Sequence, residues 1–177
     1  DRKAIAFAAL GRIWRYDVAA RTSQALTPHG LRTASPSWSP DGHWLAYVSW
    51  QDTIGGHLWK IPAAGGKPVQ LTTVASQYLN PAWSRDGSKL CVLGGSGGPM
   101  RSEGDTNDEL WLELQWIPAG GGAQHPIVMI PSQGDAPSVP RPSFNNAGDR
   151  IWYEEYGDDP SGFSEKNSLV SIRLDGT

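Results

Sequence analysis

The sequence predicts an all-β protein made of repeated four-stranded units, and three observations support this prediction. One eight-residue segment occurs twice, at 35–42 and 80–87, and a more divergent copy of it lies at 141–148. The tryptophans of the first two copies, Trp38 and Trp83, are 45 residues apart, and other markers share that spacing. In addition, 21 glycines and 14 prolines interrupt nearly every apolar run, so no stretch keeps a helical period. Such a repeat indicates an array of similar structural units.

Each unit contains the same elements in the same order. A Pro-x-Trp-Ser segment comes first, followed by an Asp-Gly turn, an apolar run, a loop, a second apolar run and a glycine-rich turn, usually closed by Val-x-Leu-Thr. Short β-branched and aromatic runs between Asp-Gly and Gly-Gly pairs are typical of antiparallel strands joined by hairpins. The first apolar runs are 45–48, 90–93 and 151–153, and the second are 58–61, 110–114 and 169–172.

Four antiparallel strands in about 45 residues match the blade of a β-propeller. The chain opens at 4–7 with the equivalent of a second strand of a blade and stops after the equivalent of a third. We therefore expect one propeller segment over 1–177 with about four blades, two complete and two partial. The expected blade units are approximately 1–27, 34–72, 79–130 and 140–177. Because propellers usually have more blades, we expect a piece of a larger propeller, or self-association if the chain is complete.

The repeated aromatic and acidic residues have structural explanations. Large aromatic side chains fill the wedge between blades, so we expect Trp38, Trp59, Trp83 and Trp111 in the core between blades. In each Asp-Gly pair the aspartate caps a tight turn through the neighbouring backbone and the glycine supplies a positive φ. We therefore do not assign the Asp-Gly aspartates a catalytic role.

Composition excludes several classes of function. The net charge of −3 and the scattered basic residues argue against a nucleic-acid partner. No apolar run approaches the roughly 20 residues of a membrane-spanning helix. The single cysteine, Cys91, lies in an apolar run, where an inert core position is expected and a disulfide within the chain is impossible.

These repeats resemble the TolB-type β-propeller repeat. The resemblance is carried by 36–42, 45–48, 57–59, 63–66 and 70–72, and covers almost the whole chain. The sequence of residues 49–66 is most similar to the propeller that precedes a metal-dependent amidohydrolase domain in some bacterial exported enzymes. The resemblance implies a periplasmic or secreted location. It also implies that Zn²⁺ or another divalent metal could bind in a downstream catalytic domain, while we expect no cofactor in this segment.

A search for catalytic motifs finds one match to a sequence pattern. Gly94-Gly95-Ser96-Gly97-Gly98 satisfies Gly-x-Ser-x-Gly, but a nucleophile elbow needs a helix after the serine, and here a proline and an acidic loop follow. The histidines His29, His43, His57 and His125 are isolated, without the spacing that places two imidazoles on one metal. We expect no catalytic or metal-binding residue in this segment.

The loops between second and third strands should share one face with the connections between blades. These loops are 51–56, 94–108 and 157–167, and long loops in compact folds are often functional. The alternative is that their charges are simply solvated, and a calcium site in the acidic loop 94–109 lacks the ordered alternation of a calcium loop. The candidate interaction residues are Asp52, His57, Tyr78, Arg101, Glu103, Asp105, Asp108, Arg141, Asp158 and Asp159.

Three functional hypotheses remain open. The first is a non-catalytic propeller module of a larger exported, amidohydrolase-like hydrolase, which docks on its own catalytic domain or gates the substrate. The second is a TolB-like propeller that binds another protein through its loop face. The third is the propeller of a prolyl-oligopeptidase or tricorn-like serine peptidase, which screens peptides by size. The partner is accordingly a further domain of the same protein or another protein.

Overall fold

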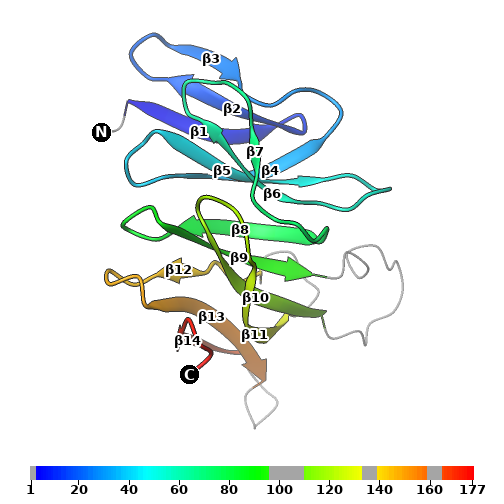
Figure 1. Ribbon diagram of the computed structural model, residues 1–177, viewed down its shortest axis with the longest axis vertical. Helices are drawn as coiled ribbons and strands as arrows, with labels where there is room; N and C mark the ends of the chain where they lie inside the picture. The colour runs from blue at the N-terminus through cyan, green and yellow to red at the C-terminus, as the bar shows by residue number, and fades with distance from the viewer. Residues whose placement is uncertain (1–2, 96–109, 133–138, 159–164) are drawn as a thin grey trace.

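The fold consists of four antiparallel β-sheets stacked along the long axis of the molecule (Figure 1). A computed structural model describes residues 3–95, 110–132, 139–158 and 165–177, and within these ranges it contains fourteen strands and no helix. The sheets have three, four, four and three strands in chain order, and every strand pair within the described residues is antiparallel. The all-β prediction, with two complete and two partial blades, is confirmed.

Each sheet uses strands in the order in which they occur along the chain. The first sheet is β1 (Ala4–Ala9), β2 (Arg12–Asp17) and β3 (Thr22–Ala25). The second is β4 (Arg32–Trp38), β5 (Trp44–Trp50), β6 (Leu58–Pro62) and β7 (Val69–Gln70).

The other two sheets follow the same plan. The third consists of β8 (Gln77–Trp83), β9 (Lys89–Gly95), β10 (Leu110–Pro118) and β11 (His125–Ser132). The fourth consists of β12 (Ser143–Phe144), β13 (Arg150–Asp158) and β14 (Glu165–Arg173). We call β4, β8 and β12 the inner strands, because each opens its sheet and pairs with the second strand of the blade.

The strands β5 and β9 are apolar on both faces because the second and third sheets each lie between two others. Along β5, Leu45 and Tyr47 join the cluster at the first sheet, whereas Ala46 and Val48 join the cluster at the third. A strand has a side-chain period of two, so an uninterrupted apolar run is required to fill both faces. In β9, buried Cys91 belongs to the junction with the fourth sheet, and burial raises the pKa of its thiol to about 12.

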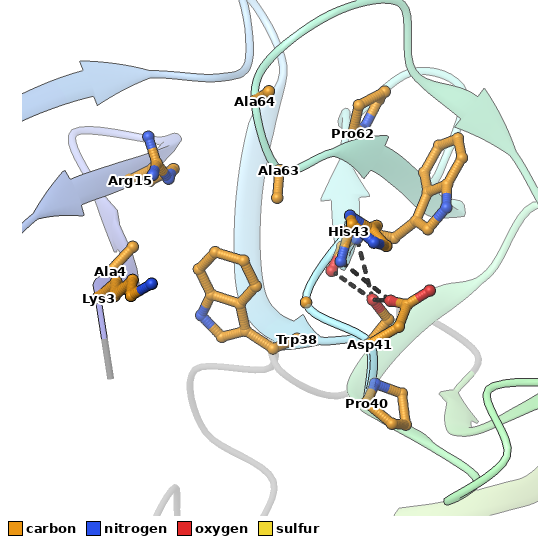
Figure 2. A pocket seen from close by; sticks show the side chains of 13 residues that line it. Lys3, Ala4, Arg15, Trp38, Pro40, Asp41, His43, Pro62, Ala63 and Ala64 are labelled. Atoms are coloured by element: carbon orange, nitrogen blue, oxygen red, sulfur yellow. Dashed lines mark hydrogen bonds between the residues drawn. The ribbon is translucent and has the colours of Figure 1, made fainter. Parts of the chain in front are cut away.

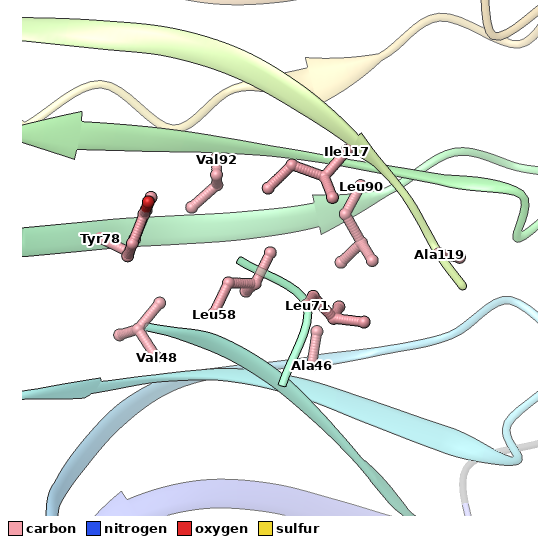
Figure 3. Packing of buried hydrophobic residues seen from close by; sticks show 9 residues of the cluster. All are labelled: Ala46, Val48, Leu58, Leu71, Tyr78, Leu90, Val92, Ile117 and Ala119. Atoms are coloured by element: carbon pink, nitrogen blue, oxygen red, sulfur yellow. The ribbon is translucent and has the colours of Figure 1, made fainter. Parts of the chain in front are cut away.

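The junction between the second and third sheets illustrates the packing (Figure 3). Leu58 and Leu71 from the second sheet are at most 1% exposed and face Leu90 and Ile117 of the third, both fully buried. Burying side chains of this size stabilises the fold by about 1.5–3 kcal/mol each. The three sheet junctions therefore supply the core of the molecule.

Three of the four tryptophans expected in the core pack there. Trp38 and Trp59 lie against the junction of the first two sheets, and Trp83 lies against the next. The expectation for Trp111 was wrong, because its side chain is 47% exposed. Alternation along β10 turns Leu112 and Leu114 to the core and Trp111 to the opposite side.

The closing Leu-Thr pairs fasten the third strand of a blade to the outer connection. The Thr27 hydroxyl accepts a hydrogen bond from the backbone N–H of Ile13 at 2.9 Å, and the Thr72 hydroxyl accepts one from Leu58 at 3.1 Å. Both acceptors are almost completely buried, so they satisfy N–H groups that water does not reach. This requirement explains why threonine recurs at the 45-residue spacing.

The Asp-Gly turns are built on a serine and an aspartate. The Ser84 hydroxyl donates to Asp86 Oδ1 at 2.6 Å and accepts a hydrogen bond from the backbone N–H of Lys89 at 2.9 Å. Gly87 follows with a φ of 71°, which L side chains rarely adopt. The hydroxyl of Ser84, followed by the N–H and hydroxyl of Ser88, holds the pKa of Asp86 well below its usual range.

The paraphrased third copy forms the same turn with different side chains. Asn145 occupies the position of the serine, and its Oδ1 accepts from the backbone N–H of Arg150 at 3.2 Å. The Asn145 amide donates to Asp149 Oδ1 at 2.7 Å, so the aspartate has moved along the turn. The turn aspartates are therefore structural partners in each of these copies.

Trp83 joins neighbouring blades by a hydrogen bond as well as by packing, since its indole N–H donates to the backbone oxygen of Ser37 at 3.1 Å. Replacing Trp83 with Phe removes the hydrogen bond but keeps an aromatic ring in the core, and should lower the free energy of unfolding by at least about 1 kcal/mol. Replacing it with Ala also opens a cavity and should cost about 3 kcal/mol. Urea unfolding of both variants measures this, and equal losses would contradict the assigned packing.

The Asp86→Asn substitution should show a stability defect that depends on pH. Because the folded-state pKa of Asp86 lies below the usual value of 3.8 for an aspartate, its carboxylate stabilises the fold above about pH 4, and this contribution is lost as pH falls through the folded-state pKa. The difference in urea midpoint between wild type and Asp86→Asn should therefore be largest at pH 7 and smaller at pH 3. A constant difference would show that ionised Asp86 contributes nothing specific.

Candidate functional site

The strand order divides the molecule into two faces (Figure 1). One face carries the β5–β6 loop and the connections from β3 to β4 and from β7 to β8, and we call it the loop face. The opposite face carries the turns at 39–43, 84–88 and 145–149, and we call it the turn face. This arrangement follows from antiparallel pairing, since alternate loops of one sheet must emerge at opposite ends.

Two candidate residues, Asp52 and His57, lie on the β5–β6 loop. Asp52 accepts a hydrogen bond from the indole N–H of Trp50 at 2.9 Å and lies 3.9 Å from the guanidinium of Arg32. His57 Nδ1 lies 3.0 Å from the hydroxyl of Thr72, and partial burial lowers the pKa of its imidazole. These contacts fix the loop to its own sheet.

Tyr78 lies inside the junction between the second and third sheets, with 2% of its surface exposed. Its hydroxyl donates to the backbone oxygen of Val74 at 2.7 Å and accepts from the side-chain amide of Gln124 at 2.9 Å. Burial raises the pKa of the phenol. The same Gln124 amide donates to Gln115, and its oxygen accepts from the backbone N–H of Val74. The connection between the sheets is thus held by hydrogen bonds of Tyr78 and Gln124, most of which are partly buried.

The glycines before Ser96 have a packing role. A Cβ on Gly94 would lie 2.8 Å from the side-chain nitrogen of Gln115, and one on Gly95 would lie 3.1 Å from Leu112. Both glycines belong to β9, so two of the glycines in the Gly-x-Ser-x-Gly match are needed for close packing. Ser96 itself lies outside the described residues.

The inner strands line an open groove of about 340 Å³. Ser35 and Asn80 adopt φ values of 51° and 49°, which are uncommon for residues other than glycine, and each precedes a proline at a break in strand register. The amide of Asn80 donates to the backbone oxygen of Pro140 at 2.9 Å and so links the third sheet to the segment that leads into the fourth. The groove is lined by Ser35, Pro36, Ser37, Asn80, Pro81, Ala82, Arg141 and Pro142.

The structure places the candidate interaction residues in different environments. Arg141 is exposed in the inner-strand groove, away from the β5–β6 loop that carries Asp52 and His57. Asp158 ends β13, but its side chain lies outside the described part. The remaining candidates also lie outside the described residues; they are Arg101, Glu103, Asp105, Asp108 and Asp159. The set as an interaction face stays a prediction.

Sequence reasoning missed Ser35, Asn80 and Gln124. The signal for the first two is their position before a proline in each copy of the repeat, and backbone geometry explains it only after the fold is known. Gln124 gives no such signal, because its partner Tyr78 is 46 residues away in the sequence.

The residues that the structure describes contain no group of three or more His, Cys, Asp or Glu side chains arranged to hold a metal ion. The histidines have separate surroundings: His29 contacts Arg12, for example, and His125 stacks on Trp116 with ring centroids 4.0 Å apart. Within the same ranges there is no helix with the length and apolar character needed to cross a membrane.

Solved structures with the same fold include two TolB proteins. TolB from Agrobacterium tumefaciens matches with 16% identity and a TM-score of 0.68, over 99% of this chain and 56% of that one. TolB from Acinetobacter baumannii matches with 18% identity and a TM-score of 0.66, over 98% and 38%. An oligogalacturonate lyase solved with manganese matches with 20% identity and a TM-score of 0.68, over 98% and 46%.

The chain spans about half the length, or less, of these proteins. No protein-family model matches the sequence, and a search of curated proteins finds no match either. At these identities the similarity concerns the fold alone, and it agrees with the arrangement of strands in the four sheets. The chain therefore has the fold of part of a TolB-like β-propeller.

Proposed function

We propose that the chain is a non-catalytic β-propeller module that binds protein, within a larger exported hydrolase of the amidohydrolase type. The observation that carries the proposal is the inner-strand groove, which combines proline rings, short polar side chains and one exposed guanidinium. The turn aspartates offer no alternative centre of chemistry, since hydrogen bonds to Ser39 and Ser84 hold them in the turns.

The groove suits a segment of polypeptide. Arg141 can offer several N–H donors to a carboxylate or to backbone oxygens, and the groove has room for a few side chains at about 340 Å³. The bulges at Ser35 and Asn80 lie within paired strands, which hold the backbone on both sides of them. The surface is therefore preorganised and loses little freedom on binding. These properties favour recognition over bond chemistry.

The proposal that the propeller belongs to a hydrolase is supported by the sequence of residues 49–66, which resembles the propeller of exported amidohydrolases. In this proposal the propeller docks on the catalytic domain or limits access to it, and any Zn²⁺ or other divalent metal is held by that domain. The expected location is the periplasm or the extracellular space. Such a division of labour agrees with the isolated positions of the histidines that the structure describes.

A second candidate is a TolB-like propeller that binds a separate protein. The specific observation in its favour is the similarity of the whole stack of sheets to two TolB structures. The two candidates differ in where the partner is encoded: in the same polypeptide for the first, and in another for the second.

The 177-residue chain, purified alone, should hydrolyse no amide or ester substrate, with or without added Zn²⁺. The physical reason is that its polar side chains hold turns and sheet junctions. Assay of a substrate panel after two orthogonal purification steps measures this. Turnover that persists in the pure chain and disappears in Ser96→Ala would contradict the proposal and restore the serine motif.

Arg141→Ala should impair the full-length gene product, whereas Arg85→Ala should not. Arg85 is a matched control, because it is an exposed arginine on the turn face that donates to Asn146. Losing a charged hydrogen-bond donor should weaken docking about 10-fold or more, seen as a higher KM for the hydrolase. Wild-type KM values in both variants would remove the groove as the contact surface, and a separate protein whose affinity falls only in Arg141→Ala would favour the second candidate.

A further inference from the structure

His57 lies directly before β6 on the loop face, beside the connection that leads from β7 to the third sheet. Its imidazole Nδ1 lies 3.0 Å from the hydroxyl of Thr72 and 3.3 Å from the side-chain nitrogen of Gln70. The ring of Trp59 meets the imidazole edge-on, with ring centroids 6.4 Å apart. Two polar side chains at the end of β7 therefore converge on one ring nitrogen.

The neighbouring contacts determine the direction of both hydrogen bonds. The nitrogen of the Gln70 amide lies 2.8 Å from the backbone oxygen of Thr72, which can only accept, so this amide is a donor. The Thr72 hydroxyl accepts from the backbone N–H of Leu58 at 3.1 Å, and its own proton is left to donate to His57. Because both groups donate to Nδ1, the neutral ring carries its proton on Nε2.

Protonation of Nδ1 is incompatible with these two hydrogen bonds. A proton taken up from solvent at this nitrogen lies against the N–H of Gln70, so the amide must move away, and the Thr72 hydroxyl must turn its own proton elsewhere. Burial lowers the pKa of the imidazole, and the backbone oxygen of Thr72 opposes this shift, because it can accept a hydrogen bond from the charged ring. The charged ring of His57 thus has an acceptor of its own.

The groups that approach the ring from neighbouring elements bring no charge to it. Ser49 of β5 is neutral and accepts a hydrogen bond from the backbone N–H of His57 at 3.3 Å. Tyr78 reaches the connection from the third sheet, and its phenol stays protonated because burial raises its pKa. Asp52, on the same loop, lies 3.9 Å from the guanidinium of Arg32. Within the described ranges no charged group contributes to the shift in the pKa of His57.

The first repeat contains a charged form of the same contact. Arg12 and Thr27 lie 45 residues before His57 and Thr72, respectively. The guanidinium of Arg12 donates through Nε to the backbone oxygen of Thr27 at 2.6 Å. In the second repeat the equivalent oxygen accepts from Gln70 instead, so a permanent cation is replaced by a histidine and a glutamine. The fold therefore tolerates a cation at this position.

We propose that His57 is a proton-operated latch on the loop face. The neutral ring holds the side chain of Gln70, and with it the end of β7, which has only two residues. Protonation releases Gln70, and the imidazolium then donates to the Thr72 oxygen as Arg12 donates to that of Thr27. The outer end of the second sheet thus has one shape at neutral pH and another at acidic pH. The latch lies outside the inner-strand groove, so this proposal is independent of the function proposed above.

The test is an NMR titration of the ¹⁵N-labelled chain between about pH 7.5 and about pH 4.5. The side-chain amide signals of Gln70 should shift with the same midpoint as the ring of His57, below the ordinary histidine pKa of about 6.5. At the upper pH the ring should carry its proton on Nε2. Gln70 signals that stay fixed while His57 titrates, or a neutral ring with its proton on Nδ1, would overturn the proposal.

The variant His57→Arg introduces the residue that the first repeat has at this position. Its Gln70 signals should show, at every pH, the shift that the wild type reaches only in acid. His43→Arg is the matched control, because His43 lies in the turn at 39–43 on the opposite face, where its backbone N–H donates to Asp41 Oδ1 at 2.9 Å (Figure 2). This control should titrate like the wild type.

Titration of Gln70 in His57→Arg as in the wild type would show that another group drives the change, and the latch would be wrong. Loss of the titration in His43→Arg would contradict the proposal in the same way. The wild-type titration needs no substitution, so it decides the matter even if His57→Arg does not fold.

Discussion

The packing of one sheet face on the next is the interaction on which the rest of this structure depends. β5 and β9 are buried on both sides, and their alternate side chains belong to different junctions. A single sheet of this size has no stable fold alone, since one apolar face would remain in water. The repeated apolar residues therefore specify the packing between sheets as well as the strands within each sheet.

Most of the conspicuous polar residues serve these junctions and their turns. Thr27 and Thr72 accept from buried N–H groups, and Ser39 and Ser84 organise the Asp-Gly turns. A buried polar group without a partner costs about 1–3 kcal/mol, so repeated sheets need repeated caps. The proposed binding surface, the inner-strand groove, lies where the repeated caps and turns do not use the side chains.

The fold could be predicted from the sequence because its signals are local and repeated. The spacing of Trp38 and Trp83 and the two Leu-Thr pairs mark one register, and each has a structural counterpart. Trp111 was placed wrongly because the loop before β10 is longer than the loop before β6. The 45-residue spacing therefore does not show which face of β10 a residue occupies. A change of one position reverses the face in a strand.

The candidate surface was harder to predict because it depends on contacts distant in sequence. Tyr78 is a polar aromatic residue at the start of a strand, and only the amide of Gln124 explains its burial. Arg141 was identified as a candidate, but its neighbours Ser35 and Asn80 meet it only after three sheets have stacked. Residues of 96–109, including the acidic candidates, lie outside the described part of the chain.

Hydrogen exchange of the 177-residue chain tests the central claim that sheet junctions hold the fold together. The account predicts that the amides of β5 and β9, buried on both faces, exchange most slowly, and that those of β1, at a sheet edge, exchange much faster. Exchange in β5 and β9 as rapid as in β1 would contradict the account, because the junctions would then contribute no protection.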